Sequence, residues 1–247
     1  MKISMFVAAL VFVYSSPAVV TAAILYGDFT GTTVMYLDVT ESNGTDVQKF
    51  GAPNIFGDQL DFNPTNFRAQ SDGAAVIEDS QLNMTIMSIT TGTPITDVFI
   101  DEAGDFTLSG LDPAQAMATV GTNVMFTVTH VGGNIISPVC VGTDQVVFTP
   151  NANGEFMLPG DQGTATPWTG NLDYDIEALL ASCGVGGEAT KVEVVLDNTL
   201  TATAANGGAA FIAKKDFRGL TITVPEPSSL GLLLAAFAGV SAFMRRR

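Results

Sequence analysis

The stretch KVEVVLDNTLTATAANGGAAFIA, residues 191–213, decides the fold class of this chain. Apolar and polar residues alternate along Val192–Asp197 and again along Thr199–Ala204, which is the two-residue period of a half-buried β-strand. Asn206-Gly207-Gly208 follows, and an Asn-Gly pair supplies the positive φ angles that a tight turn requires. A return arm covers Ala210–Ala213. The stretch therefore predicts a β-hairpin and an all-β domain.

The same two-residue period recurs through most of the chain, between clusters of Gly, Asn, Asp, Pro and Thr. Further strands are predicted at Thr33–Thr40, Asp58–Phe62, Ala74–Glu78, Leu82–Met87, Pro94–Asp101, Asp105–Leu108, Asn123–Val131, Gln145–Phe148 and Leu220–Val224. Many short strands at this spacing favour a single β-sandwich or jelly-roll-like domain over residues 23–223. One segment differs: Asp173–Ser182 has helical spacing, with Asp173 or Asp175 as the N-cap and Gly184 as the stop.

Both ends of the chain have the composition of targeting segments. Lys2 precedes an apolar run, and Val20-Thr21-Ala22 fits a signal-peptidase site, which predicts a signal peptide over residues 1–22. At the other end, Pro225-Glu226-Pro227 precedes an apolar run over Leu230–Met244 and the terminal cluster Arg245, Arg246 and Arg247. A helix over that run would be about 22 Å long, a short membrane span, and the arginines would stay on the cytoplasmic side.

The order of features at the C-terminus resembles the PEP-CTERM sorting signal of exported bacterial proteins. The resemblance covers residues 224–247 and implies that an exosortase-type enzyme recognises and processes the chain at the membrane; the alternative is a simple C-terminal membrane anchor. Parts of the body also resemble exported PEP-CTERM proteins of planctomycete-type bacteria, which are mostly uncharacterised β-rich proteins. The residues that carry this second resemblance are Tyr26–Phe29, Phe50–Pro53, Asp61–Pro64, Lys191–Asp197 and Phe211–Asp216.

Charge and cysteine content restrict the compartment and the partners. The chain has 10 Lys and Arg against 25 Asp and Glu, a net charge of −15, which argues against nucleic acid and anionic membrane surfaces as partners of the body. Its two cysteines, Cys140 and Cys183, are predicted to form a disulfide, as an even pair does in an oxidising compartment. That bond would connect the end of the predicted helix to the sheet.

No catalytic constellation is predicted. The single histidine, His130, belongs to an alternating strand pattern, and the chain has no Gly-x-Ser-x-Gly motif. Asp101, Glu102 and Asp105 could surround a calcium ion in an acidic turn, but a solvated acidic hairpin turn is the preferred interpretation. Trp168, the only tryptophan, is expected to fill the core, with sugar stacking as the alternative. No cofactor is assigned, and no metal ligand is identified.

Three functions are consistent with these features. The leading interpretation is an exported, non-enzymatic protein of the cell surface or extracellular matrix that associates with exopolysaccharide. Before processing, its C-terminal helix would hold it in the membrane. A carbohydrate-binding module or a polysaccharide-acting enzyme on a jelly-roll scaffold, calcium-dependent in one version, is the alternative. A third interpretation is an adhesive subunit that self-associates through an edge strand.

Overall fold

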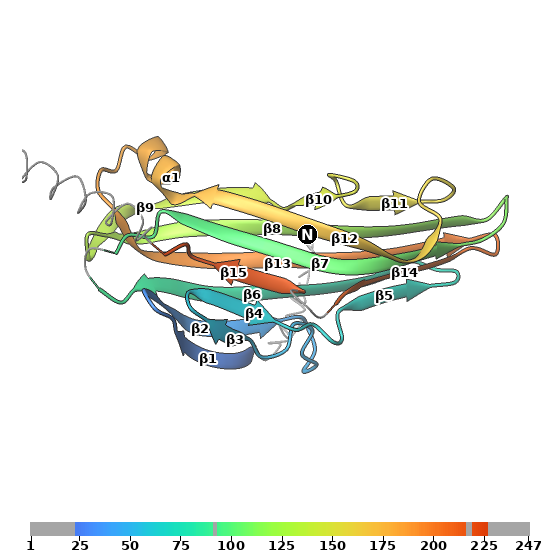
Figure 1. Ribbon diagram of the computed structural model, residues 1–247, viewed down its shortest axis with the longest axis horizontal. Helices are drawn as coiled ribbons and strands as arrows, with labels where there is room; N and C mark the ends of the chain where they lie inside the picture. Colours follow the sequence, from blue (N-terminus) through green and yellow to red (C-terminus); the bar gives the residue numbers. More distant parts are fainter. Residues whose placement is uncertain (1–22, 91–92, 216–218, 227–247) are drawn as a thin grey trace, which may run out of the picture.

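The computed structural model describes residues 23–90, 93–215 and 219–226, and this part of the chain forms two antiparallel β-sheets with one short helix (Figure 1). The sheets pack face to face in an elongated sandwich, with the helix at one end. The prediction of an all-β chain with one short helix is confirmed. The predicted signal peptide and the predicted C-terminal membrane helix lie outside the described residues.

Sheet A contains seven strands among the described residues, and sheet B contains eight. In spatial order, sheet A consists of β1 (Ile24–Thr30), β2 (Val34–Ser42), β6 (Val76–Ser88), β13 (Ala189–Ala205), β8 (Gln115–Val131) and β11 (Glu155–Met157), with β9 (Asn134–Gln145) also paired to β8. Sheet B consists of β10 (Val147–Thr149), β12 (Gly163–Asp175), β7 (Asp97–Ser109), β15 (Leu220–Thr223), β4 (Gln59–Phe62) and β3 (Asn54–Phe56), with β14 (Ala209–Lys214) pairing with β7 and with β5 (Arg68–Ser71).

The core lies between the facing surfaces of the two sheets and follows directly from the alternation in the sequence. In β13, Val192, Val194 and Leu196 are completely buried, while the residues between them are exposed or half-buried. Successive side chains of a strand point to opposite faces of its sheet, so every second residue reaches the core. The residues between them form the outer face.

The Asn206-Gly207 turn is confirmed, but the hairpin predicted around it is wrong. Asn206 and Gly207 have φ angles of 54° and 81°, as the turn prediction requires. However, β13 belongs to sheet A and β14 to sheet B, so the turn connects the two layers and no ladder joins its arms. The reason is that β13 is already paired on both sides, with β6 and with β8, and has no free edge for β14.

Two predicted breaks between strands do not exist. Ala74–Glu78 and Leu82–Met87 were assigned to separate strands, but they fall largely within the continuous strand β6. Likewise Pro94–Asp101 and Asp105–Leu108 fall largely within β7, and β12 pairs with β7 through Ala103 and Gly104 without interruption. The predicted acidic hairpin turn at Asp101–Asp105 is therefore wrong, because this segment lies in the middle of a strand.

The helix and the disulfide form as predicted. Helix α1 spans Ile176–Ser182, and the carboxylate of its N-cap, Asp175, accepts a hydrogen bond of 2.7 Å from the backbone N–H of Ala178. Asp173, the other N-cap candidate, lies two residues before the N-cap, within β12. The disulfide Cys140–Cys183 joins the C-cap residue of α1 to β9 and closes a loop of 43 residues.

Strand β15 is the last strand within the described residues and lies in the interior of sheet B, between β7 and β4. Leu220 and Ile222 are completely buried. Val224, directly after the strand, is buried as well, and its backbone N–H donates a hydrogen bond of 3.1 Å to the carbonyl oxygen of Asp58. The folded domain therefore extends to Val224, the residue directly before Pro225.

Candidate functional site

The outer face of sheet A carries rows of side chains across its strands, most of them polar, and we call this surface the polar face. One row runs through Gln145, Asn123, Asp197 and Gln81, which are register partners on β9, β8, β13 and β6. The next row runs through Thr143, Met125, Val195 and Asn83 in the same strand order. Because these strands are neighbours and in register, the side chains of each row lie side by side on one surface.

Two shallow depressions lie next to each other on the polar face. The larger has a volume of about 570 Å³ and is lined by Asn123, Gln145 and Asp197, among others. The smaller, of about 340 Å³, is lined by Asn83 and Glu193, and both depressions share Val195 as a lining residue. Amide groups offer donors and acceptors together, and carboxylates offer acceptors only. The surface therefore suits a ligand rich in hydroxyl groups.

Hydrogen bonds fix some of these polar groups in place. The Nε2 of Gln145 donates to Oδ1 of Asn123 over 2.8 Å, and the hydroxyl of Thr199 donates to Oδ1 of Asp79 over 2.6 Å. Asp79 and Asp197 are diagonal neighbours across β6 and β13. Partial burial of Asp197, and secondarily the negative charge of Asp79, raise the pKa of the Asp197 carboxyl above its usual value.

Replacing this carboxyl by an amide should stabilise the protein at neutral pH. Because the pKa of Asp197 is raised on folding, the folded state binds the proton more tightly, and the stability this provides is lost as the pH rises through the folded pKa. The melting temperature of Asp197→Asn should therefore exceed that of the unaltered protein at pH 7. The difference should disappear below the unfolded pKa. Asp79→Asn should give part of the same gain in melting temperature. A melting-temperature difference between Asp197→Asn and the unaltered protein that did not depend on pH would contradict the raised pKa of Asp197.

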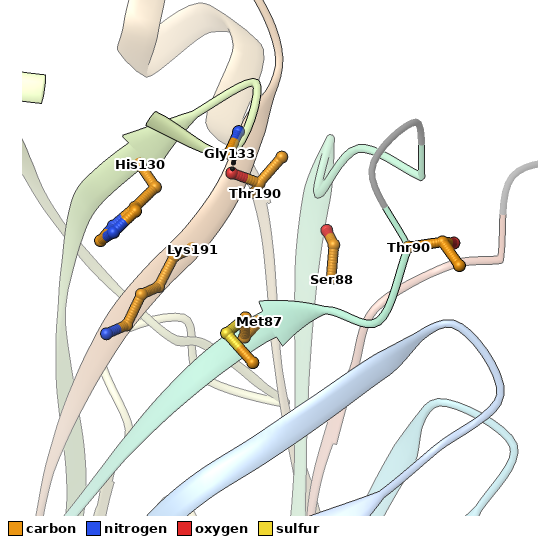
Figure 2. Close-up of a pocket in the computed structure, with 7 residues that line it drawn as sticks. All are labelled: Met87, Ser88, Thr90, His130, Gly133, Thr190 and Lys191. Carbon is orange, nitrogen blue, oxygen red and sulfur yellow. Dashed lines mark hydrogen bonds between the residues drawn. The ribbon is translucent and has the colours of Figure 1, made fainter. Parts of the chain in front are cut away.

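A smaller pocket of about 190 Å³ lies at one end of sheet A (Figure 2). Lys191 is opposite His130 in β8 and opposite Met87 in β6, and the side chains of Lys191 and His130 point in the same direction. Thr190 accepts a hydrogen bond of 3.0 Å from the backbone N–H of Gly133 and thereby fixes the turn above the pocket. The pocket places two basic side chains at the edge of an otherwise acidic protein.

The residues singled out from the sequence occupy separate places. His130 is half-buried near the end of β8, and its Nδ1 lies 3.1 Å from the hydroxyl of Thr129. Trp168 is 1% exposed, so the expectation that it fills the core is confirmed. Among the described residues no group of three or more His, Cys, Asp or Glu side chains is arranged to hold a metal ion.

The three carboxylates of the predicted acidic turn, for which calcium binding was the alternative, have different partners. Asp101 accepts a hydrogen bond of 2.6 Å from Nδ2 of Asn171 on β12, and Asp105 forms an ion pair with Lys215. Glu102 faces the core, where its Oε2 lies 2.7 Å from Nζ of Lys214, and both side chains are completely buried. Alternation along β7 sends Glu102 to the face opposite Asp101, while Asp101 and Asp105 lie four residues apart and contact separate partners, Asn171 and Lys215.

The cluster around Glu102 was not found from the sequence. It contains Glu102, Lys214, Asn198 and Thr122, all of them buried between the sheets. A signal for it exists, because each polar residue occupies a position where the two-residue period calls for an apolar one. Asn198, for example, follows Val194 and Leu196 and precedes Leu200.

The processing residues lie where the folded domain ends. Pro225 is half-buried and Glu226 is exposed, directly after the buried Val224. Pro227, Arg245, Arg246 and Arg247 lie outside the described residues. None of the helices within the described ranges is long and apolar enough to cross a bilayer.

Comparison with known proteins gives one informative match. No curated protein matches the chain. One solved structure that it resembles is the crystal structure of the enzymatically active domain of tailspike protein 4 of bacteriophage CBA120, at 15% identity and a TM-score of 0.20. That match covers 81% of this chain and 19% of the tailspike chain, so the chain spans about a fifth of its length, and at this TM-score the likeness carries no conclusion. Residues 223–247, by contrast, match the family model described as the PEP-CTERM protein-sorting motif. The C-terminus of this chain is thus a PEP-CTERM sorting motif, which indicates an exported, surface-directed protein and an exosortase substrate.

Proposed function

We propose that this protein is a non-enzymatic component of the cell surface or extracellular matrix, sorted there by an exosortase-type system and associated with exopolysaccharide. The observation that carries the proposal is the sorting motif at residues 223–247, which begins at the last residue of β15. In this role the C-terminal segment holds the chain in the membrane until processing. The domain then acts outside the cell without a cofactor and without nucleic acid as a partner.

The polar face supports the association with exopolysaccharide. Asn123, Gln145 and Gln81 lie in one row and each offers an amide donor and an amide acceptor to a sugar hydroxyl. Met125 and Val195 in the adjacent row add apolar surface beside them. An extended surface of this kind fits a long polysaccharide better than a small closed ligand, which a deeper cavity would enclose.

Removal of one central amide tests this association. In the exported form of the protein, Asn123→Ala should weaken sedimentation with isolated exopolysaccharide by about tenfold in Kd, because loss of one good hydrogen bond costs about 1.4 kcal/mol. Asn171→Ala is the matched control, since Asn171 is an exposed asparagine in β12 of sheet B. Equal binding by both variants and the unaltered protein would remove the polar face from the proposal.

The second candidate is a polysaccharide-acting enzyme on the same surface, and the diagonal pair Asp79 and Asp197 favours it. Glycoside hydrolysis uses two carboxyl groups about 5–10 Å apart, one of them with a raised pKa. Release of reducing ends from the exopolysaccharide, lost in Asp197→Asn, would identify an enzyme. Repeating the binding and melting measurements with a chelator tests the calcium-dependent version of either function.

A further inference from the structure

Four polar side chains meet in the middle of the sandwich, and they come from both sheets. Glu102 of β7 and Lys214 of β14 belong to sheet B. Asn198 of β13 and Thr122 of β8 belong to sheet A and are direct register partners. All four are buried, and the side chains of Glu102 and Lys214 have no exposed surface. The cluster therefore bridges the two layers at a point that water does not reach.

The contacts place an amine and an amide on the two oxygens of one carboxyl group. Nζ of Lys214 lies 2.7 Å from Oε2 of Glu102, although the approach is not aligned for a hydrogen bond. Nδ2 of Asn198 donates to the other oxygen, Oε1 of Glu102, over 3.0 Å. The hydroxyl oxygen of Thr122 lies 2.9 Å from Oε2 of Glu102 and 2.9 Å from Oδ1 of Asn198.

The surroundings of Lys214 favour an uncharged amine. Nζ lies 5.7 Å from the ring centroid of Trp168 and 5.9 Å from that of Phe67; the faces of these rings attract a cation, but both rings are buried and keep water away from the amine. Desolvation lowers the pKa of Lys214, and Glu102 only partly opposes this effect. Transfer of the ammonium proton to Glu102 removes two charges from the apolar interior at once. It also produces a nucleophilic amine next to a carboxylic acid.

The hydroxyl of Thr122 favours the same protonation state. Its single proton cannot be donated to Glu102 and Asn198 together. If Glu102 carries a proton on Oε2, it can donate to Thr122 Oγ1, and Thr122 then donates to Oδ1 of Asn198. In this arrangement the carbonyl of Asn198 is polarised by a fixed donor, as an oxyanion is stabilised in acyl transfer.

We propose that Lys214 and Asn198 form an intramolecular isopeptide bond in the folded domain, with Glu102 as the catalytic acid and base. The neutral Nζ of Lys214 attacks Cγ of Asn198, while Glu102 passes a proton to the departing Nδ2 and receives one from Nζ. A C–N bond forms between the two side chains, the original amide C–N bond breaks, and one molecule of ammonia leaves. The reaction needs no oxidant and no cofactor, because the carboxyl group holds the reacting groups in place and is regenerated.

This bond would connect the two layers of the sandwich covalently. Asn198 and Lys214 lie on either side of the turn at Asn206-Gly207, one in sheet A and one in sheet B. Gly104 permits the arrangement, because a Cβ at this position would lie 2.0 Å from the carbonyl oxygen of Ala213 and 2.4 Å from the Trp168 ring. The strand that carries Glu102 can therefore approach the end of β14 closely.

Peptide mapping of the exported, folded protein tests the bond directly. After denaturation and reduction, chymotrypsin cleaves the backbone after Leu200 and Phe211, which separates Asn198 from Lys214. We expect the two peptides to stay joined, with a mass lower by one ammonia than the sum of the separate peptides. Asn206-Gly207 can also lose ammonia by forming a succinimide, but that reaction joins no peptides. Separate peptides from the unaltered protein would overturn the proposal.

Three variants assign the roles. Glu102→Gln keeps the side-chain volume but removes the acid and base, and it should leave the peptides separate. In Asn198→Asp the same bond would form with loss of water instead of ammonia, so the mass of the joined peptides identifies the group attacked. Lys215→Gln is the matched control, because Lys215 pairs with Asp105 outside the cluster and its loss should leave the peptides joined. Joined peptides in Glu102→Gln would refute the role of the carboxyl group. If a variant does not fold, the peptide map of the unaltered protein still shows whether the bond exists.

Discussion

A chain truncated after Val224 should fold and lose its sorting, whereas a chain truncated after Gly219 should not fold. The two truncations differ by residues 220–224, which contain all of β15. Loss of Leu220, Ile222 and Val224 removes three buried side chains, worth about 1.5–3 kcal/mol each or roughly 5–9 kcal/mol together, from a domain whose total stability is about 5–15 kcal/mol. It also leaves the backbone of β4 and β7 without its hydrogen-bonding partner.

Cell fractionation and protease digestion separate the two effects. The chain that ends at Val224 retains the sandwich, so it should resist protease as the full-length chain does but should not reach its surface location. The chain that ends at Gly219 should be degraded. Delivery of the Val224 truncation to the surface would show that residues 225–247 are dispensable for sorting. Protease resistance of the Gly219 truncation would show that β15 contributes little to the fold.

The second large effect should be the loss of stability on removal of the disulfide. Replacing Cys140 and Cys183 by serine opens a loop of 43 residues, and the chain-entropy model gives a loss of about 4 kcal/mol in the free energy of unfolding. Helix α1 should remain in place at low denaturant, because Ile176 is completely buried and Leu180 nearly so. The loss therefore acts mainly through the greater freedom of the unfolded chain.

Denaturant titration under oxidising conditions measures this loss from the midpoint and the slope. The unaltered protein in the presence of a reductant is the control, and it should approach the stability of the double variant. If the double variant and the oxidised protein had the same midpoint, the disulfide would have no part in stability. A loss confined to the circular dichroism of the helix would indicate local rather than global stabilisation.

Much of the fold follows from local sequence. The alternation along Val192–Ala204 predicts the central strand of sheet A, and Asn206-Gly207 predicts the turn after it. Asp175 and Gly184 mark the ends of the helix region because capping is a short-range interaction. The disulfide was predicted as well, since the chain has only two cysteines. These features depend on residues that are close in sequence or that leave no alternative partner.

The errors arise where distant residues decide. Ala103-Gly104 was interpreted as a turn between acidic residues, but β12 and β14 pair with this segment and hold it extended. In the same way, the sequence around Asn206 does not show that β6 and β8 already occupy both edges of β13. Which strand pairs with which is a property of the whole domain, so the turn was predicted and the layer change was not.

The candidate sites also differ in how far apart their residues lie in the sequence. The sorting motif was predicted because its recognition elements are consecutive in sequence. The polar face is formed by residues as far apart as Gln81 and Asp197, which only the strand order brings together. Glu102 and Lys214 are 112 positions apart, and nothing near either residue identifies the other as its partner.

The interior position of β15 also determines how the domain responds to mechanical force. If the C-terminal segment holds the chain in the membrane until processing, as the proposed function requires, tension on the domain would enter at Val224 and run along β15. Two antiparallel ladders, to β4 and to β7, resist this tension together in shear, so their hydrogen bonds must break as a group rather than one after another. An edge strand has only one ladder. In the proposed function, the sandwich would thus be connected to the membrane-held segment through a strand that is well suited to bear load.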